Sequence, residues 1–213
     1  VLTPEYAHLS SEDKTWKTFY NRSWTENPVN WMFGVDIIGG FYASNPGDSI
    51  KANLYPWGWQ GLDYNDQHWE TPKWAGATSS TGGFDWVLEP RSTPIQVEKK
   101  LPFPGIIRSE GLTANTKVTF PMSIPGQSKV KLLIDNQVLS IGYPEMWISN
   151  GKNTSITITY AENLYDANKQ RKNRNVIQGM HIRGLHDTYI VDGGKERLYK
   201  PLWMRAFRFI ELA

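Results

Sequence analysis

The sequence contains no cysteine among its 213 residues, and this absence excludes several classes of protein. Without a thiol there is no disulfide scaffold, no zinc site with thiolate ligands, no cysteine-ligated iron–sulfur cluster and no cysteine nucleophile. A chain of this length still buries roughly 70% of the surface that its unfolded form exposes. With 39% hydrophobic and 21% charged residues, the composition is that of an ordinary globular protein.

The chain also lacks an excess of charge and any long apolar run. Its 23 basic and 21 acidic residues leave a net charge of +2, and the two signs are mixed along the sequence. Because no basic stripe is present that could follow a phosphate backbone, nucleic acid is not an expected partner. No stretch approaches the ~18 consecutive apolar residues of a membrane span, so we expect none.

Helical patterning is scarce. Residues 10–13 offer a cap with acidic residues in the first turn, and Trp16, Phe19 and Tyr20 follow at helical spacing. The pattern therefore predicts a short N-terminal helix in a helical extension over residues 1–25.

From about residue 30 onward, short apolar runs alternate with Gly, Pro, Asn and Asp, a pattern that predicts many short strands. Two-residue alternation is clearest within residues 129–134 and 155–160. Between them, a turn at residues 135–137 and strands at residues 138–141 and 146–148 are expected, with residues 142–144 connecting the two strands. Further strand candidates are residues 29–38, 86–89, 95–99, 117–120, 188–191 and 206–212. We therefore predict an all-β fold, a β-sandwich or jelly roll, as a single module over residues 1–213 with a loop-rich insertion at residues 40–83.

An aromatic loop is the strongest compositional signal. It comprises Tyr55-Pro56-Trp57-Gly58-Trp59, with Trp69, Trp74 and Trp86 downstream. Exposed rings can stack on the apolar faces of sugars, although large aromatic residues are also common in cores and as loop anchors. If the loop binds carbohydrate, we expect Trp57 and Trp59 to form the platform. The oxygen atoms of Asp63, Asn65 and Asp66 would then accept hydrogen bonds from sugar hydroxyls.

The same oxygen donors superficially resemble a calcium-binding loop. Counted from Asp63, however, the sixth position is His68 instead of glycine and the twelfth is Trp74 instead of a bidentate glutamate. Turn hydrogen bonds that let Trp69 pack into the fold are the favoured interpretation. We therefore predict no cofactor and no metal site, with calcium in this loop as the alternative.

Carboxylates and histidines suggest no complete active site. Four acids could serve in glycoside hydrolysis, but their spacing selects no pair, so no residue is assigned a catalytic role. They are Glu145, Glu162, Asp166 and Asp187. His181 and His186 stand five apart in a segment that looks extended, where their side chains would point to opposite faces.

Two arginines, Arg205 and Arg208, occupy an aromatic-rich strand near the C-terminal end of the sequence. A guanidinium in such a strand can stack on an aromatic ring or pair with a carboxylate, for which Glu162 and Glu211 are candidates. A structural network is the favoured interpretation.

Several segments occur in a characteristic order over residues 130–212. They are Leu132–Asp135, Gly142–Glu145, Ile158–Asp166, Asn173–Asn175, Ile182–Gly184 and Tyr199–Ile210. Together they resemble the bacterial α-L-rhamnosidases of glycoside hydrolase family 78. Upstream, Asp63–Trp69 resembles an acidic turn with a tryptophan found in β-sandwich modules of glycosidases, and Leu88–Pro94 resembles a run near the family's interdomain boundary.

The resemblance implies a non-catalytic role for this chain. In that family the catalytic carboxylates belong to a helical (α/α)6 barrel, and β-sandwich modules precede it. The chain would thus be a galactose-binding-like β-sandwich that supplies scaffold and carbohydrate recognition. Its expected partner is the catalytic (α/α)6 domain of a parent chain that degrades polysaccharide, in the periplasm or outside the cell. Two alternatives stay open: an autonomous carbohydrate-binding module for rhamnose-containing or plant glycans, and a small enzyme with its own carboxylate pair.

Overall fold

The computed structural model describes residues 15–27, 46–73, 91–113 and 118–213. The chain divides into two compact units. The first consists of residues 1–20 and 56–101, and the second of residues 21–55 and 102–213. Most of the predicted insertion therefore shares a unit with the N-terminal segment, and the extent of one module over residues 1–213 stays a prediction.

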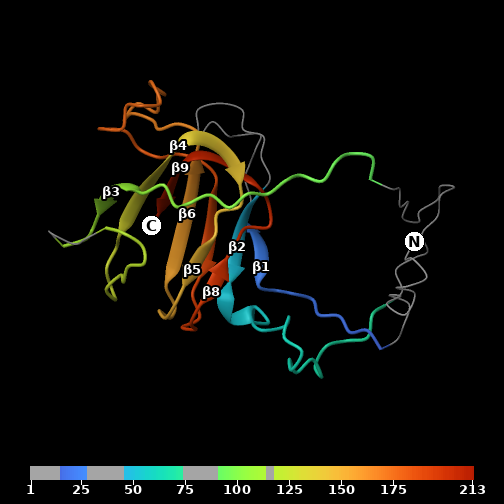
Figure 1. Cartoon of the computed structure of the whole chain (residues 1–213). Coiled ribbons are helices and arrows are strands. Elements are labelled where there is room, and N and C mark those ends of the chain that lie inside the picture. Colours follow the sequence, from blue (N-terminus) through green and yellow to red (C-terminus); the bar gives the residue numbers. More distant parts are fainter. Residues whose placement is uncertain (1–14, 28–45, 74–90, 114–117) are drawn as a thin grey trace. The chain divides into compact units, whose positions relative to one another are not determined.

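The second unit is built on a seven-stranded mixed sheet (Figure 1). Its strand order is β1-β2-β7-β6-β9-β4-β3, with β1 and β3 at the two edges; β2 and β7 run parallel, and the other neighbours are antiparallel. A separate two-stranded ribbon pairs β5 with β8. The strands are β1 (Trp24–Asn27), β2 (Gly47–Lys51), β3 (Ile106–Glu110), β4 (Lys131–Gly142), β5 (Met146–Ile148), β6 (Ser155–Ala161), β7 (His186–Ile190), β8 (Arg197–Tyr199) and β9 (Arg205–Leu212).

On one side of the sheet, apolar residues from the long connection between β6 and β7 pack against the strands. Leu133 of β4 and Phe209 of β9 are buried there, and Leu164 and Met180 from the connection pack against them. Arg108 of β3 donates a hydrogen bond to the Met180 carbonyl oxygen at 2.8 Å. The two ends of the connection therefore contribute to the core, while its middle part, residues 167–176, is exposed.

The other side of the sheet is covered by the β5–β8 ribbon. Tyr199 of β8 is buried, and its ring meets that of Tyr189 on β7 edge to face at 5.8 Å. Ile158 and Tyr160 of β6, two residues apart, are buried on this side. The all-β sandwich predicted from the sequence is confirmed, as are the strands predicted within residues 129–134, 146–148, 155–160, 188–191 and 206–212. Residues 138–141 are also extended, but they belong to the same strand as residues 131–134. The turn expected at residues 135–137 is instead an irregularity within β4.

The predicted N-terminal helix is wrong over the described residues of its range. Thr18 instead forms an isolated bridge with Glu70, its backbone N–H and carbonyl both bonding that residue. Phe19 stacks on Trp69, so the aromatic residues at helical spacing serve to anchor a loop. Residues 1–14 lie outside the described residues.

Other strand predictions have mixed outcomes. Residues 95–99 lie outside any strand, residues 29–38 and 86–89 fall outside the described part, and residues 118–120 of the 117–120 candidate are not in a strand. The only helical element in the described residues is the single 3₁₀ turn at Ala52–Leu54. None of the described residues form a helix long and apolar enough to cross a membrane.

Candidate functional site

The aromatic loop of the first unit is a succession of tight turns. The Trp59 amide bonds the Pro56 carbonyl at 3.1 Å, and the Gly61 amide bonds the Gly58 carbonyl at 2.8 Å. Gly58 has φ +84°, a conformation that side chains disfavour. Trp57 is half-buried, whereas Trp59 is 46% exposed. Of the two predicted platform residues, Trp59 presents more surface to solvent.

The polar residues of this loop make local contacts. The Asn65 side-chain oxygen accepts the Gln67 amide at 3.1 Å, and the Asp66 carbonyl accepts the Trp69 amide at 2.9 Å. The Asp66 carboxylate pairs with Lys17 at 2.8 Å, and the hydrogen bond from Lys17 lowers its pKa. Asp63 is exposed. The interpretation of residues 63–69 as turns that position Trp69 agrees with these bonds.

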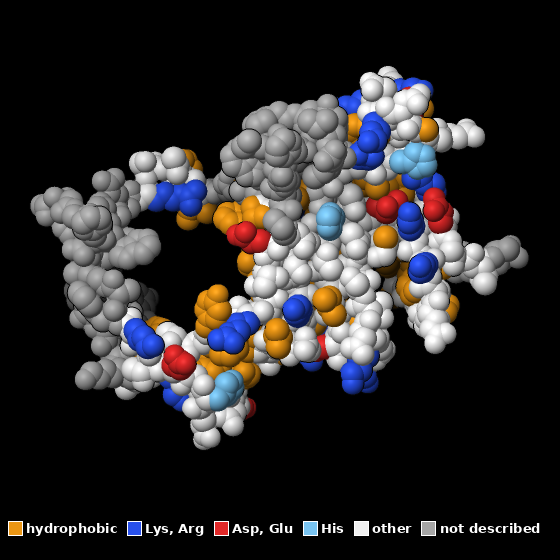
Figure 2. Space-filling model, turned by 180° about the vertical axis from the view of Figure 1, so that it is seen from behind, with side chains coloured by type: hydrophobic (Ala, Val, Ile, Leu, Met, Phe, Trp, Pro, Cys, Tyr) orange, Lys and Arg blue, Asp and Glu red, His pale blue; other side chains and the backbone are white. Residues whose placement is uncertain are grey.

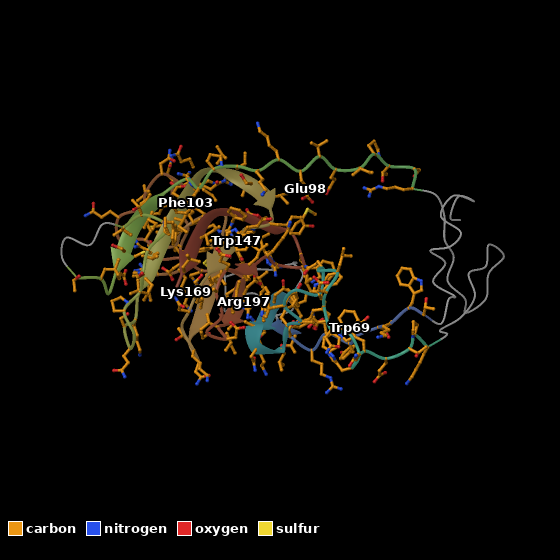
Figure 3. The ribbon with its side chains drawn as sticks, turned by 60° about the horizontal axis from the view of Figure 1, so that its bottom comes forward. Trp69, Glu98, Phe103, Trp147, Lys169 and Arg197 are labelled. Carbon is orange, nitrogen blue, oxygen red and sulfur yellow. The ribbon has the colours of Figure 1, made fainter. Side chains whose placement is uncertain are left out.

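Trp69 is the anchor of the loop. Its ring stacks on that of Phe19, with the ring centres 5.5 Å apart, and lies 5.7 Å from the ring of Tyr64. Figure 3 labels Trp69 among the side chains of this part of the chain. It therefore belongs to an aromatic cluster, while the nearby Trp59 carries the exposed ring. Trp74 and Trp86 lie outside the described residues.

Three of the four acids considered for glycoside hydrolysis have a basic partner of their own. Glu145 pairs with Lys200 at 3.2 Å and Asp166 with Lys172 at 3.3 Å, while Asp187 is held by Arg205. Glu162 is exposed just after β6. The structure gives these acids separate environments.

No metal-binding cluster occurs among the residues that the structure describes, since no group of three or more His, Asp or Glu side chains there could hold an ion. The two histidines have backbone roles. His181 bridges Tyr165, and His186 pairs with Thr159 at the start of β7.

A buried ionic cluster links the sheet to the ribbon. Asp187 is fully buried, and its carboxylate is gripped by both Nε and Nη2 of Arg205, at 3.1 and 2.6 Å. The hydroxyls of Tyr160 and Tyr199 donate to the same carboxylate at 2.8 and 2.5 Å. Burial, reinforced by the Asp187 charge, raises the pKa of both tyrosines, so they remain donors. The cluster thus joins β6, β7, β8 and β9.

Asp48 of β2 extends the cluster toward the segment before β9. Its amide donates to Asp187 at 2.7 Å, and its carboxylate accepts the Leu202 amide at 2.6 Å and lies 3.3 Å from Arg205. Burial, with repulsion from Asp187, raises the pKa of Asp48. The structural network expected for Arg205 is present, but its partners are Asp187 and Asp48 instead of Glu162 or Glu211.

Arg208 makes a second, separate pair. Its Nε and Nη2 donate to the two carboxylate oxygens of Asp135 at 2.9 and 3.1 Å, and its Nη1 donates to Asn175 at 3.0 Å. Burial raises the pKa of Asp135, but the hydrogen bonds from Arg208 and the Gln137 amide outweigh it and lower the pKa overall. The pair links β9 to β4 at the point where the register of their pairing shifts, between Asp135 and Ser140.

Trp147 of β5 is an exposed aromatic residue that the sequence placed in a strand without identifying it as exposed. A local signal exists, because Glu145, Trp147 and Ser149 are separated by apolar Met146 and Ile148 and all three are exposed. That two-residue alternation identifies an outward-facing tryptophan on a half-exposed strand.

Residues 127–213 match the family described as the bacterial alpha-L-rhamnosidase concanavalin-like domain. The matched segment runs from just before β4 to the end of β9, and it includes Asp187 and Arg205. The resemblance to bacterial α-L-rhamnosidases is thereby confirmed for this part of the chain. No curated protein matches the chain.

Three solved structures are similar to the chain. The Streptomyces avermitilis α-L-rhamnosidase complexed with L-rhamnose is 20% identical, with a TM-score of 0.46, over 78% of this chain and 14% of that protein. The Dictyoglumus thermophilum α-L-rhamnosidase is 19% identical, with a TM-score of 0.46, over 94% and 18%. The Aspergillus terreus enzyme is 13% identical, with a TM-score of 0.41, over 78% and 16%. The chain spans less than a fifth of each.

Proposed function

We propose that the chain serves as a non-catalytic β-sandwich module of a larger α-L-rhamnosidase-type glycoside hydrolase, in which it supplies scaffold to a catalytic (α/α)6 domain. The observation that carries this proposal is the concanavalin-like domain of bacterial α-L-rhamnosidases over residues 127–213. The chain's small share of its structural neighbours' length fits such a role, because most of those proteins lies outside the part that it matches.

The surroundings of the acids support a non-catalytic role. Glycoside hydrolysis needs two carboxyl groups that face one substrate, about 5 Å apart for retention and roughly 6.5 to 9.5 Å apart for inversion. Asp187 is fully buried under Arg205, and Asp166 is tied to Lys172 and to turn amides. These carboxylates act as structural acceptors.

Two measurements test the module assignment. The purified chain is expected to release no nitrophenol from 4-nitrophenyl α-L-rhamnopyranoside, and release at a rate abolished by one carboxylate substitution would contradict the non-catalytic role. In the producing organism, an antibody against the chain is expected to deplete α-L-rhamnosidase activity from periplasmic or secreted fractions. Recovery of only a free 24.4 kDa species without activity would instead favour an autonomous module.

Carbohydrate recognition by the aromatic loop is the finer part of the proposal. Trp59 offers an exposed ring, Trp57 lies two residues before it, and the oxygens of Asp63 and Asn65 are close in sequence. Asp66 is the weakest of the five predicted ligands, because Lys17 already occupies its carboxylate. The same loop would serve an autonomous module for rhamnose-containing or plant glycans, which is the alternative function.

A calorimetric titration with rhamnose and rhamnose-containing oligosaccharides, with and without calcium, tests this recognition. Saturable binding in the micromolar to millimolar range is expected to weaken about tenfold or more in Trp59→Ala. Trp203→Ala, which removes an exposed tryptophan of the second unit, is the matched control. Unchanged affinity in folded Trp57→Ala and Trp59→Ala variants would exclude the loop as the site. A change in affinity when calcium is present would instead support a calcium site in this loop.

A further inference from the structure

The outer face of the β5–β8 ribbon displays an aromatic ring toward solvent. In the ribbon's register Met146 pairs with Tyr199, and Trp147 pairs with Leu198. Tyr199 points inward, where its hydroxyl bonds Asp187. Since neighbouring residues of a strand face opposite sides, Trp147 and Leu198 lie on the outer side. Trp147 is 68% exposed, more than any other tryptophan in the described part of the chain.

A charged pair flanks this ring on the same face. Glu145 precedes Trp147 by two residues, and its carboxylate lies 3.2 Å from the Lys200 ammonium. Both side chains are partly exposed, and the ammonium also sits 5.2 Å from the centre of the Tyr143 ring. The pair therefore offers hydrogen-bond donors and acceptors, held in position, about one dipeptide repeat of ~6.6 Å along the strand from Trp147.

The ribbon is fixed in place from within and at its end. Tyr199 is tied to the buried Asp187, and the Arg197 guanidinium pairs with Asp192 at 3.0 Å. At the far end of the ribbon the Ser149 hydroxyl accepts the Glu196 amide at 2.9 Å. Figure 3 shows Trp147 and Arg197 in the same region of the molecule. A ring on such a support needs little ordering when a ligand arrives, which favours binding.

The chemistry of this face selects one class of ligand. A flat indole favours a partner with an apolar face, and the adjacent ion pair favours a partner whose rim carries hydroxyls. A nucleotide fits less well, because the charges of Glu145 and Lys200 cancel. On the face drawn in Figure 2, which is the back of the view in Figure 1, Lys and Arg side chains lie beside Asp and Glu side chains. We propose that the outer face of the ribbon binds a pyranose unit of a neutral glycan, with Trp147 stacked on the sugar and Glu145 and Lys200 bonded to its hydroxyls.

This site goes beyond the proposed function, because it uses no residue of the aromatic loop and stands whether or not that loop binds sugar. The test is saturation-transfer NMR and indole ¹⁵N shifts on the whole 213-residue chain. The probes are methyl α-L-rhamnopyranoside, methyl β-D-galactopyranoside and methyl β-D-glucopyranoside, each to about 50 mM because sites of this kind bind weakly. At least one probe is expected to saturate and to shift the Trp147 indole signal.

Variants locate the binding. Trp147→Ala is expected to weaken it about tenfold or more, while Trp147→Tyr retains part of it and Trp203→Ala leaves it unchanged. Glu145→Gln with Lys200→Met is expected to weaken it less, since the ring remains. All of these side chains are at least partly exposed, so the fold should tolerate the changes.

Three results would overturn the proposal. Binding that survives in Trp147→Ala and disappears in Trp59→Ala would assign the sugar to the aromatic loop and leave the proposed function intact. Failure of all three probes to bind would reject a pyranose site on the ribbon. Self-association in sedimentation that Trp147→Ala abolishes would make the ribbon face a protein contact. Loss of binding in Trp147→Ala with retention in Trp59→Ala would support the proposal, whatever becomes of the loop.

Discussion

Two arginine–aspartate pairs on β9 use the same chemistry at different depths. Arg205 and Asp187 have side chains that are 1% and 0% exposed, whereas those of Arg208 and Asp135 are 11% and 8% exposed. Both arginines bond a carboxylate through Nε and Nη2. The deeper carboxylate needs three further donors, while the shallower one is completed by a single turn amide. The more deeply buried carboxylate thus needs hydrogen-bond donors from more elements of the fold to offset the loss of its hydration.

Removing the deeper arginine should have the largest effect. Arg205→Met leaves Asp187 buried without its counter-charge, so we expect a loss of about 3 to 5 kcal/mol in the free energy of unfolding. Urea unfolding followed by tryptophan fluorescence measures it. If this variant fails to fold, Arg205→Lys, which cannot form the fork, should fold with a smaller loss. A loss below that of the Arg208 variant would contradict the ranking by depth.

The shallower pair should cost less to break. For Arg208→Met we expect a loss of about 1 to 3 kcal/mol, because Asp135 keeps the Gln137 amide and regains some water. The same urea experiment measures this loss, with Lys17→Met as the control that breaks an exposed pair and should leave the midpoint nearly unchanged. Equal losses for the two β9 arginines would show that burial does not set the difference.

The tyrosines around the cluster sharpen the comparison further. Tyr199 and Tyr189 are equally buried, but the Tyr199 hydroxyl bonds Asp187 and the Tyr189 hydroxyl has no partner in the described part of the chain. Tyr199→Phe should therefore cost about 1 to 3 kcal/mol, and Tyr189→Phe should be neutral or slightly stabilising. Thermal and urea unfolding of the two variants provide a matched pair. A larger loss in Tyr189→Phe would reveal a partner for its hydroxyl.

The smallest expected effect is a change in pH dependence. The pKa of Asp135 is lowered from 3.8, so its stabilising contribution is complete above about pH 4 and is lost as the pH falls through its folded-state pKa. Asp48 has a raised pKa, so its effect has the opposite sign: it favours folding at low pH and loses that effect as the pH rises through its folded-state pKa. Asp135→Asn should thus flatten the acid-side decline of stability in urea titrations between about pH 5 and pH 2. A steeper decline would contradict this sign.

Local patterns explain which parts of the fold could be read in advance. Residues 155–160 alternate between apolar and polar side chains, and they form β6. This strand could be predicted because alternation can be recognised from neighbouring residues alone. The N-terminal aromatics gave a false helical signal, because their spacing says nothing about Trp69, which lies 50 positions beyond Phe19 in the sequence and stacks on it. The strand at residues 146–148 is expected from the sequence, but three residues carry too little alternation to show that Trp147 is the one that faces solvent.

The sequence by itself determined the all-β class, the absence of thiol chemistry, and the resemblance to bacterial α-L-rhamnosidases over its C-terminal part. Only the tertiary structure decided which carboxylates hold Arg205 and which tryptophan faces outward on the ribbon. The reason is that these contacts join residues that lie far apart in the sequence. Asp48 meets Asp187 across 139 positions of sequence, through a parallel pairing of β2 with β7 that no local pattern encodes. The periodicity of a strand indicates which of its side chains are buried, but the pairing of strands decides which residues those side chains contact.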